Sequence, residues 1–187
     1  TICLVGSEMC IRDRIEPLNV KTDPGAVFIA GGTDLYVQRG EELPERAVRV
    51  LAHEDGLHYV RRDADTIRVG ALTTFEQFAQ APEIRQMFPD IDETMYLIAS
   101  LQVRNRASLG GNIINASPIG DMTGFLLSLG TTLTLEAPDG ARREVAMRDF
   151  FLGYKTLDKA PEELLVELAF PAISPSERAN FEKVSKR

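Results

Sequence analysis

Two glycine-containing segments hold the residues best suited to bind a polar ligand. The first, Ala30-Gly31-Gly32-Thr33-Asp34, follows a short apolar run and precedes a helix-like segment. Glycine adopts positive φ readily and can leave backbone N–H groups pointing into a concavity, while a helix N-terminus adds partial positive charge. The segment therefore suits a phosphate. Taken alone, such a segment is more often a tight turn in which Thr33 or Asp34 caps the helix.

The second segment spans residues 104–121 and is richer in polar groups. It combines the pair Gly110-Gly111 with asparagines, serines and an expected capped helix N-terminus. All of these can hydrogen-bond a ligand without adding net charge. The alternative is an elaborate connection between two helices. Because one ligand would have to touch both segments, we expect the Gly31-Gly32 and Gly110-Gly111 loops to face each other across one cleft.

Reactive side chains are scarce. Neither segment has the lysine and hydroxyl of an NTPase phosphate loop or the spacing of a dinucleotide-binding βαβ unit. His53 and His58 flank a turn and could share a metal, although such pairs are more often surface residues. Cys3 and Cys10 are too few for an iron-sulfur cluster or a four-thiolate zinc site. We therefore predict no catalytic residue and no metal ligand, and a bound cofactor, such as a flavin dinucleotide, that carries the chemistry.

Composition narrows the class of partner. The 187 residues carry a net charge of −7, with 44% apolar and 26% charged residues, the balance of a soluble globular protein. An acidic chain is a poor match for the phosphate backbone of nucleic acid. No apolar run approaches the ~20 residues that cross a bilayer, and no signal peptide pattern occurs. We expect no nucleic-acid or membrane partner, and a cytoplasmic location.

The first half of the chain predicts a small α/β unit. Residues 26–30 form a continuous apolar run typical of a strand buried on both faces. Residues 48–51 and 57–60 predict two further strands, separated by a turn at 53–56. Residues 67–71 predict another strand, after which Thr73 and Glu76 have the spacing of a capping box. The helix that follows should bury Phe75 and Phe78.

The second half predicts helices and a mainly antiparallel sheet. A helix is expected over residues 91–101. Another should begin at Pro118, with Ser117 as its cap, and present an apolar stripe of Met122, Phe125, Leu126 and Leu129 before Gly130. Residues 131–137 and 141–146 predict a hairpin about a Pro-Asp-Gly turn. Residues 164–170 alternate strictly, which predicts a strand that ends at Pro171.

Four regions follow from these patterns. Residues 1–14 lack periodicity and contain a string similar to a translated sequencing adapter, so we expect a non-native or disordered head. Residues 15–64 are expected to form part of an N-terminal lobe, and residues 65–173 a second lobe. Residues 174–187 are expected to open a following element that is cut short.

Four motifs carry a resemblance to a known family. They are the segments 28–34, 104–121, 150–157 and 161–165. Together they resemble the FAD-binding domain of xanthine dehydrogenases and related molybdenum hydroxylases, from about residue 25 to the end. The resemblance implies an α+β, two-lobed FAD-binding fold of the vanillyl-alcohol-oxidase type, with a small parallel α/β lobe and an antiparallel sheet with helices, and a probable fragment.

The resemblance also implies which residues bind FAD. The pyrophosphate is expected on the backbone of residues 30–34, and Leu165 is expected against the flavin ring system. Gly32 and Asn115 stand where mammalian relatives have Asn and Thr, and both can still bind. The full set of expected contacts is Phe28, Ile29, Ala30, Gly31, Gly32, Thr33, Asp34, Leu35, Ser108, Gly111, Asn112, Ile114, Asn115, Ser117, Asp121 and Leu165.

In this family a molybdenum centre oxidises the substrate, iron-sulfur clusters pass the electrons on, and FAD delivers them to NAD. The resemblance therefore implies an electron-transfer component with FAD, and NAD as acceptor. The molybdenum cofactor and [2Fe-2S] clusters are expected on partners, namely an iron-sulfur domain and a molybdenum-binding subunit. Two alternatives stay open: the flavin subunit of a carbon monoxide dehydrogenase or aldehyde oxidase relative, and a non-catalytic nucleotide-binding module.

Overall fold

The computed structural model describes residues 25–174, 177 and 179–184. The expected head at residues 1–14 and both cysteines lie outside these residues. The elements fall into a five-stranded sheet with helices, a two-stranded parallel sheet near the first glycine loop, and a two-stranded hairpin. This is the mixed α and β architecture expected from the sequence.

The five-stranded sheet is antiparallel throughout. Its order is β3-β4-β9-β5-β6, so the last strand of the chain lies in the centre. The strands are β3 (Val60–Asp63), β4 (Thr66–Gly70), β5 (Thr132–Glu136), β6 (Arg142–Ala146) and β9 (Leu164–Pro171). The hairpin β5–β6 confirms the pattern around the Pro-Asp-Gly turn.

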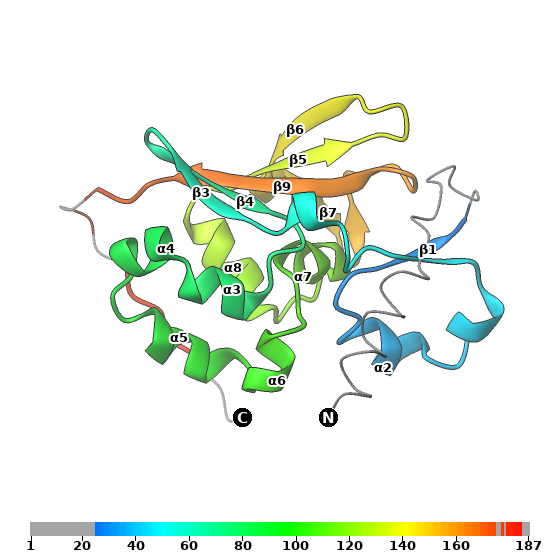
Figure 1. Ribbon diagram of the computed structural model, residues 1–187, viewed down its shortest axis with the longest axis horizontal. Helices are drawn as coiled ribbons and strands as arrows, with labels where there is room; N and C mark the ends of the chain where they lie inside the picture. The colour runs from blue at the N-terminus through cyan, green and yellow to red at the C-terminus, as the bar shows by residue number, and fades with distance from the viewer. Residues whose placement is uncertain (1–24, 175–176, 178, 185–187) are drawn as a thin grey trace, which may run out of the picture.

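Helices cover one face of this sheet, as Figure 1 shows. They are α3 (Phe75–Gln80), α4 (Pro82–Met87), α5 (Ile91–Ile98), α6 (Leu101–Arg104), α7 (Leu109–Asn115) and α8 (Asp121–Ser128). Apolar residues at alternate strand positions and at helical intervals meet in one core, whose fully buried members include Ile67, Leu133, Leu168, Phe170, Phe78, Ile84 and Leu126. Burial of each such side chain contributes about 1.5–3 kcal/mol.

Strand β9 contains a bulge that the sequence pattern did not reveal. Its register against β5 runs from Glu167 opposite Thr134 directly to Leu165 opposite Leu135, so Val166 is the extra residue. The expected strict alternation along residues 164–170 is therefore wrong at this point. The bulge brings Leu165 into the same buried cluster as Leu168 and Phe170. Bulges re-aim side chains in this way next to binding sites.

A smaller unit precedes the large sheet. Strands β1 (Val27–Ile29) and β2 (Val48–Val50) pair in parallel, and the short helix α2 (Leu35–Arg39) follows the first glycine loop. Two 3₁₀ turns, η1 (Leu43–Glu45) and η2 (Asp55–Leu57), complete the connections. β1 is less buried than its apolar run suggests: Ile29 is buried, whereas Phe28 is half-buried because it lines a cleft.

A hairpin links the centre of the large sheet to its edge. Helix α9 (Met147–Phe150) leads into β7 (Phe151–Gly153) and β8 (Thr156–Leu157), which pair across a two-residue turn. The strand expected over residues 57–60 begins at Val60 and, as β3, pairs with β4. Residues 60–63 thus share a sheet with the second expected lobe, and the division at residue 64 stays a prediction.

Three helix ends differ from expectation. The capping box lies one residue later than predicted: Thr74 accepts a hydrogen bond from Gln77 N, and the Gln77 side chain accepts one from Thr74 N. Thr73 instead donates its hydroxyl to Tyr59 O. Phe75 and Phe78 are buried, as expected.

The helix expected over residues 91–101 is broken at Ala99, which is extended. The break is stabilised by Arg104, whose Nη1 donates to the carbonyls of Met95 and Ala99. Helix α8 begins at Asp121 and not at Pro118. Pro118 sits in a turn closed by the hydrogen bond from Gly120 N to Ser117 O, a position that proline favours. The apolar stripe of α8 is buried at Met122, Phe125 and Leu126, as expected.

No helix in the part of the chain that the structure describes is long and apolar enough to cross a bilayer.

Candidate functional site: a cleft between two glycine loops

A cleft of about 480 Å³ lies where the two glycine loops meet. This volume falls in the range of small-molecule sites, roughly 300–1,000 Å³. Its walls come from β1 and the following loop, from the start of α7, and from the residues that lead into β9. All but three of the expected FAD contacts line it: Phe28, Ala30, Gly31, Gly32, Thr33, Asp34, Leu35, Ser108, Gly111, Asn112, Ile114, Asn115 and Leu165.

The two loops touch each other directly. A Cβ atom built on Gly31 would lie 1.7 Å from the carbonyl oxygen of Arg106, and one on Gly111 would lie 3.6 Å from Ala30 Cβ. Arg106 Nε also donates to Gly31 O at 3.4 Å. The expectation that these loops face each other across one cleft is confirmed. Glycine is needed at position 31 because the backbones approach too closely for a side chain.

The first loop presents free backbone donors. Gly32 has φ of +70°, and the chain then turns into α2 through the hydrogen bond from Tyr36 N to Gly32 O. For the five consecutive N–H groups of residues 31–35, no acceptor occurs among the residues that the structure describes. The N–H groups at the start of a helix have no partner within the helix, so those beside α2 are available to a ligand that enters the cleft. Successive N–H groups around a positive-φ glycine form an anion-binding concavity.

Asp34 takes the N-cap position of α2 but makes no side-chain cap. Its carboxylate instead accepts a hydrogen bond from Gln38 Nε2, one turn along the helix. A turn in which the Asp34 side chain caps the helix therefore does not describe this loop.

The second segment contains helix α7, which was not predicted from the sequence. The first N–H groups of α7 already have partners: Leu109 N donates to Thr73 O, Gly110 N to Ala71 O, and Gly111 N to Ser108 Oγ. They are not available to a phosphate. These bonds are long-range in part, so no local sequence pattern reveals them.

The second loop contributes amide side chains to the cleft, and its backbone packs closely on a neighbouring segment. Asn112 Oδ1 accepts from Thr123 Oγ1 at 3.0 Å, which orients its side chain and leaves the amide N–H₂ group as a donor. Asn115 also lines the cleft. A Cβ on Gly110 would lie 2.7 Å from Ala71 O, so this glycine is needed where α7 approaches the backbone just after β4.

Three expected contacts lie away from the cleft lining. Ile29 is buried in β1, and Ser117 lies in the turn before α8. Asp121 pairs with Lys183 at 2.7 Å, and both side chains are about one quarter exposed. These residues stay predictions as FAD contacts.

The third wall of the cleft was not found from the sequence. It comprises Lys155, Lys159, Glu163 and Leu164, which join the expected Leu165. Gln38 and Arg39 on α2 also line the cleft. The residues are scattered in the sequence and lack a ligand-binding pattern, so only the fold brings them together.

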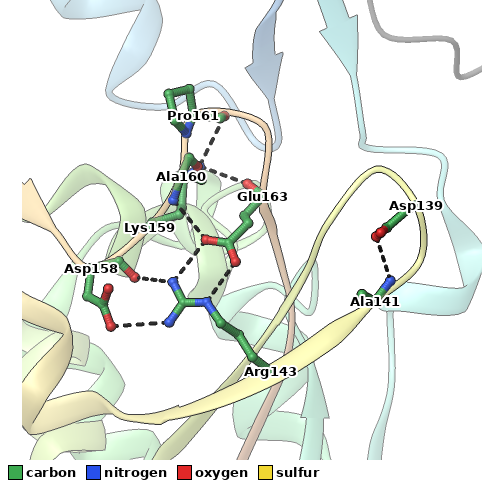
Figure 2. A network of polar contacts seen from close by, with 8 residues as sticks. All are labelled: Asp139, Ala141, Arg143, Asp158, Lys159, Ala160, Pro161 and Glu163. Carbon is green, nitrogen blue, oxygen red and sulfur yellow. Dashed lines mark hydrogen bonds and ion pairs between the residues drawn. The ribbon is translucent and has the colours of Figure 1, made fainter.

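A network of polar contacts fixes this wall, as Figure 2 shows. Arg143 on β6 binds the Glu163 carboxylate through two nitrogens, at 2.7 and 2.9 Å, and contacts Asp158 through Nη1 at 3.1 Å and through the Asp158 carbonyl at 2.7 Å. Lys159 Nζ donates to the carbonyls of Ala160, Pro161 and Glu163. The loop before β9 is therefore tied to the sheet edge at both ends.

Electrostatics follow from this geometry. The hydrogen bonds from Arg143 lower the pKa of Glu163 to about 2. In turn, the hydrogen bond to Glu163 raises the pKa of Arg143. Burial lowers the pKa of Lys159. Its ammonium is held by carbonyl oxygens, which stabilise the charge locally. Glu163 and Lys159 are thus both held by contacts that fix the wall.

The lining of the cleft suits a bound cofactor better than a metal ion. In the described ranges, no group of three or more His, Cys, Asp and Glu side chains is arranged to hold a metal. His58 Nδ1 lies 3.4 Å from Gln77 Oε1, and the cleft lining includes neither histidine. Free N–H groups for a pyrophosphate, amides for polar substituents, and the apolar Phe28, Ile114 and Leu165 for a ring system fit a flavin dinucleotide.

Comparison with known proteins agrees with this chemistry. The chain is 31% identical over 170 residues to the nicotinate dehydrogenase FAD-subunit of Eubacterium barkeri, covering 88% of this chain and 57% of that protein. It is 41% identical over 104 residues to xanthine dehydrogenase of Dictyostelium discoideum, covering 54% of this chain and 8% of that protein.

The fold is similar to that of a solved carbon monoxide dehydrogenase from Hydrogenophaga pseudoflava, in a form that lacks the Mo-pyranopterin moiety of the molybdenum cofactor. The TM-score is 0.78 at 29% identity, covering 87% of this chain and 56% of that chain. The chain thus spans somewhat more than half of the flavin subunit and of the solved chain that it matches.

The family model described as the FAD binding domain in molybdopterin dehydrogenase matches residues 12–173. That range contains both glycine loops, the network around Arg143 and the whole of the large sheet. The resemblance inferred from the four motifs is therefore confirmed: the chain belongs to the family of FAD-binding domains of molybdopterin dehydrogenases.

Proposed function

We propose that this chain is the FAD-binding electron-transfer component of a xanthine dehydrogenase-type molybdenum hydroxylase. In this role it passes electrons from iron-sulfur clusters on a partner domain to NAD. The molybdenum cofactor is carried by a further subunit, where the organic substrate is oxidised. We also propose a cytoplasmic location.

The observation that carries the proposal is the row of N–H groups at residues 31–35 that have no acceptor within the described ranges, beside a cleft of ligand-binding size. Backbone donors of this kind bind phosphate oxygens and tolerate no bulky side chain nearby. We assign the pyrophosphate to this loop, and polar groups of the dinucleotide to the amides of Asn112 and Asn115. Leu165 provides the apolar surface for the flavin ring.

Bound FAD would supply both hydride and single-electron exchange, which no side chain in the cleft provides. The residues of this chain would bind the FAD, orient it and shield it from solvent. The bulge at Val166 places Leu165 at the cleft edge, and Arg143 keeps the loop before β9 closed on the same side. Such preorganised walls lower the entropic cost of binding a long ligand.

The alternative within the family is the flavin subunit of a carbon monoxide dehydrogenase or aldehyde oxidase relative. The similarity to the solved Hydrogenophaga enzyme extends over 87% of the chain, whereas the xanthine dehydrogenase match has higher identity over a shorter range. We favour the xanthine dehydrogenase type on the motifs at residues 116–118 and 150–156. A non-catalytic nucleotide-binding module is the alternative outside the family.

Purified chain supplied with FAD tests the proposal. A relay component should become yellow, with flavin absorbance that stays with the protein through gel filtration, and should oxidise NADH slowly with an artificial electron acceptor. It should not oxidise xanthine, because that reaction requires a metal-oxo centre on another subunit. Flavin binding without NADH oxidation would favour the module or another acceptor. Xanthine turnover by chain free of molybdenum and iron would contradict the relay function.

A further inference from the structure

Lys155 has an unusual backbone and lines the cleft. It occupies the two-residue turn between β7 and β8, with φ of +53°, in the left-handed region that non-glycine residues seldom adopt. A glycine there would be less strained. Strained residues of this kind concentrate at active sites and ligand clamps, where the surrounding structure holds them in place.

The Lys155 side chain reaches from this turn to helix α2, which follows the first glycine loop. Its Nζ lies 3.2 Å from Gln38 Oε1, and Gln38 Nε2 in turn donates to the Asp34 carboxylate. The amide of Gln38 therefore bridges a cation on the hairpin and an acid beside the free N–H groups. A carboxylate at that position would repel a phosphate unless it is held aside and its charge is offset.

The other cations that line the cleft are already committed. Arg39 pairs with Glu42 at 3.1 Å. Lys159 donates to three carbonyl oxygens, as Figure 2 shows, and burial lowers its pKa. Among the cleft-lining residues within the described ranges, Lys155 is thus the one cation held only by a neutral amide.

We propose that Lys155 is the counter-charge for the pyrophosphate of the bound dinucleotide. The inference rests on the proposed FAD-binding function. The N–H groups of residues 31–35 supply hydrogen bonds to the phosphates but no net charge, and the cleft also contains the acid Asp34. A lysine on a flexible four-carbon stem can leave Gln38 and donate to a phosphate oxygen as a point charge.

Two variants at position 155 test the role of the charge. Lys155→Gly removes the ammonium and relieves the strained φ, so its thermal stability should equal or exceed that of the wild type. Lys155→Arg keeps the charge. Arg148→Gln removes one positive charge at an 84% exposed side chain outside the cleft lining and serves as the charge control. Affinity is measured by quenching of flavin fluorescence on titration of purified apo-chain with FAD, and by competition with ADP, at several salt concentrations.

The expected result is a dissociation constant for FAD about tenfold higher in Lys155→Gly, with ADP weakened by a similar factor. The dissociation constants of Lys155→Arg and Arg148→Gln for FAD and ADP should stay close to those of the wild type. The salt dependence of FAD binding should be shallower in Lys155→Gly, because one charge contact has been lost.

Unchanged FAD affinity in Lys155→Gly would overturn the inference while leaving the FAD function intact. So would a loss of FAD affinity without any loss for ADP, which would locate the effect at the flavin half. Failure of the wild-type chain to bind FAD at all would overturn the proposed function and this inference together.

Discussion

Gly31 lies against the backbone of Arg106 so closely that a Cβ atom at position 31 would stand 1.7 Å from the Arg106 carbonyl oxygen. This contact joins the two glycine loops at the base of the cleft. Seventy-five residues separate the two positions in sequence. The glycine thus serves the approach of two chain segments, in addition to any ligand that the loop binds.

Gly31→Ala should therefore destabilise the protein and weaken FAD binding together, because the loops must move apart to accept a methyl group. We expect a loss of about 1–3 kcal/mol in the free energy of unfolding. Gly56→Ala is the matched control, since a Cβ there meets nothing within 4 Å. Urea unfolding of both variants checks the prediction, and equal stabilities would contradict it.

Gly111→Asp should reduce FAD affinity by at least about tenfold, with a smaller effect on folding. The new Cβ would lie 2.7 Å from Ser108 Oγ, which caps α7, and the carboxylate would enter the cleft near the free N–H groups. Gly124→Asp adds the same charge on an exposed part of α8 with open space around it. Titration with FAD should separate the two variants; comparable affinities would contradict the assignment of the cleft.

Leu165→Ala and Leu168→Ala distinguish the cleft wall from the core. Both leucines belong to the same buried cluster, but only Leu165 lines the cleft. Each substitution should cost about 2–5 kcal/mol of stability. Only Leu165→Ala should also alter the absorbance spectrum of bound flavin. A spectral change of the same size in Leu168→Ala would show that Leu165 has no special place at the ring.

Glu163 predicts a specific dependence of stability on pH. Its pKa is lowered from 4.5 to about 2 by Arg143, so the folded state binds this proton less well than the unfolded state. The stabilisation is present above pH 4.5 and is lost as the pH falls toward about 2. Glu163→Gln should be less stable at pH 7 by about 1.5–3 kcal/mol, the value of hydrogen bonds to a charged group.

Across the window from pH 4.5 to about 2, the unfolding free energies of wild type and Glu163→Gln should converge. Asp139→Asn, on the exposed turn between β5 and β6, is the control. Its unfolding free energy should change with pH as that of the wild type does. Curves for wild type and Glu163→Gln that stay parallel down to pH 2 would contradict the role of the Arg143 pair.

The sequence predicted the glycine loops and their meeting because both depend on local residue types and on one shared ligand. It also predicted the β5–β6 hairpin, whose Pro-Asp-Gly turn and alternation are local signals. The third wall could not be predicted in this way. Lys155 and Glu163 reach the cleft only because the hairpin β7–β8 and the start of β9 pack beside α2 and α7.

The errors at the site also have a physical cause. Helix α7 was not predicted within the segment 104–121, and the residues after β4 supply carbonyl acceptors at Ala71 and Thr73 for its first N–H groups. The bulge at Val166 breaks an alternation that looked continuous. Both features arise from pairing between distant segments, which periodicity along the chain does not report.

The central claim is that the backbone amides of residues 31–35 hold the pyrophosphate of FAD. Nuclear magnetic resonance of ¹⁵N-labelled chain tests it directly, by following the amide signals during separate titrations with FAD and ADP. Both ligands should shift the signals of Gly31 to Leu35 strongly, while those of Gly110 and Gly111, whose N–H groups are already bonded, should shift less. Saturable FAD binding that leaves the amides of residues 31–35 unchanged would contradict the account.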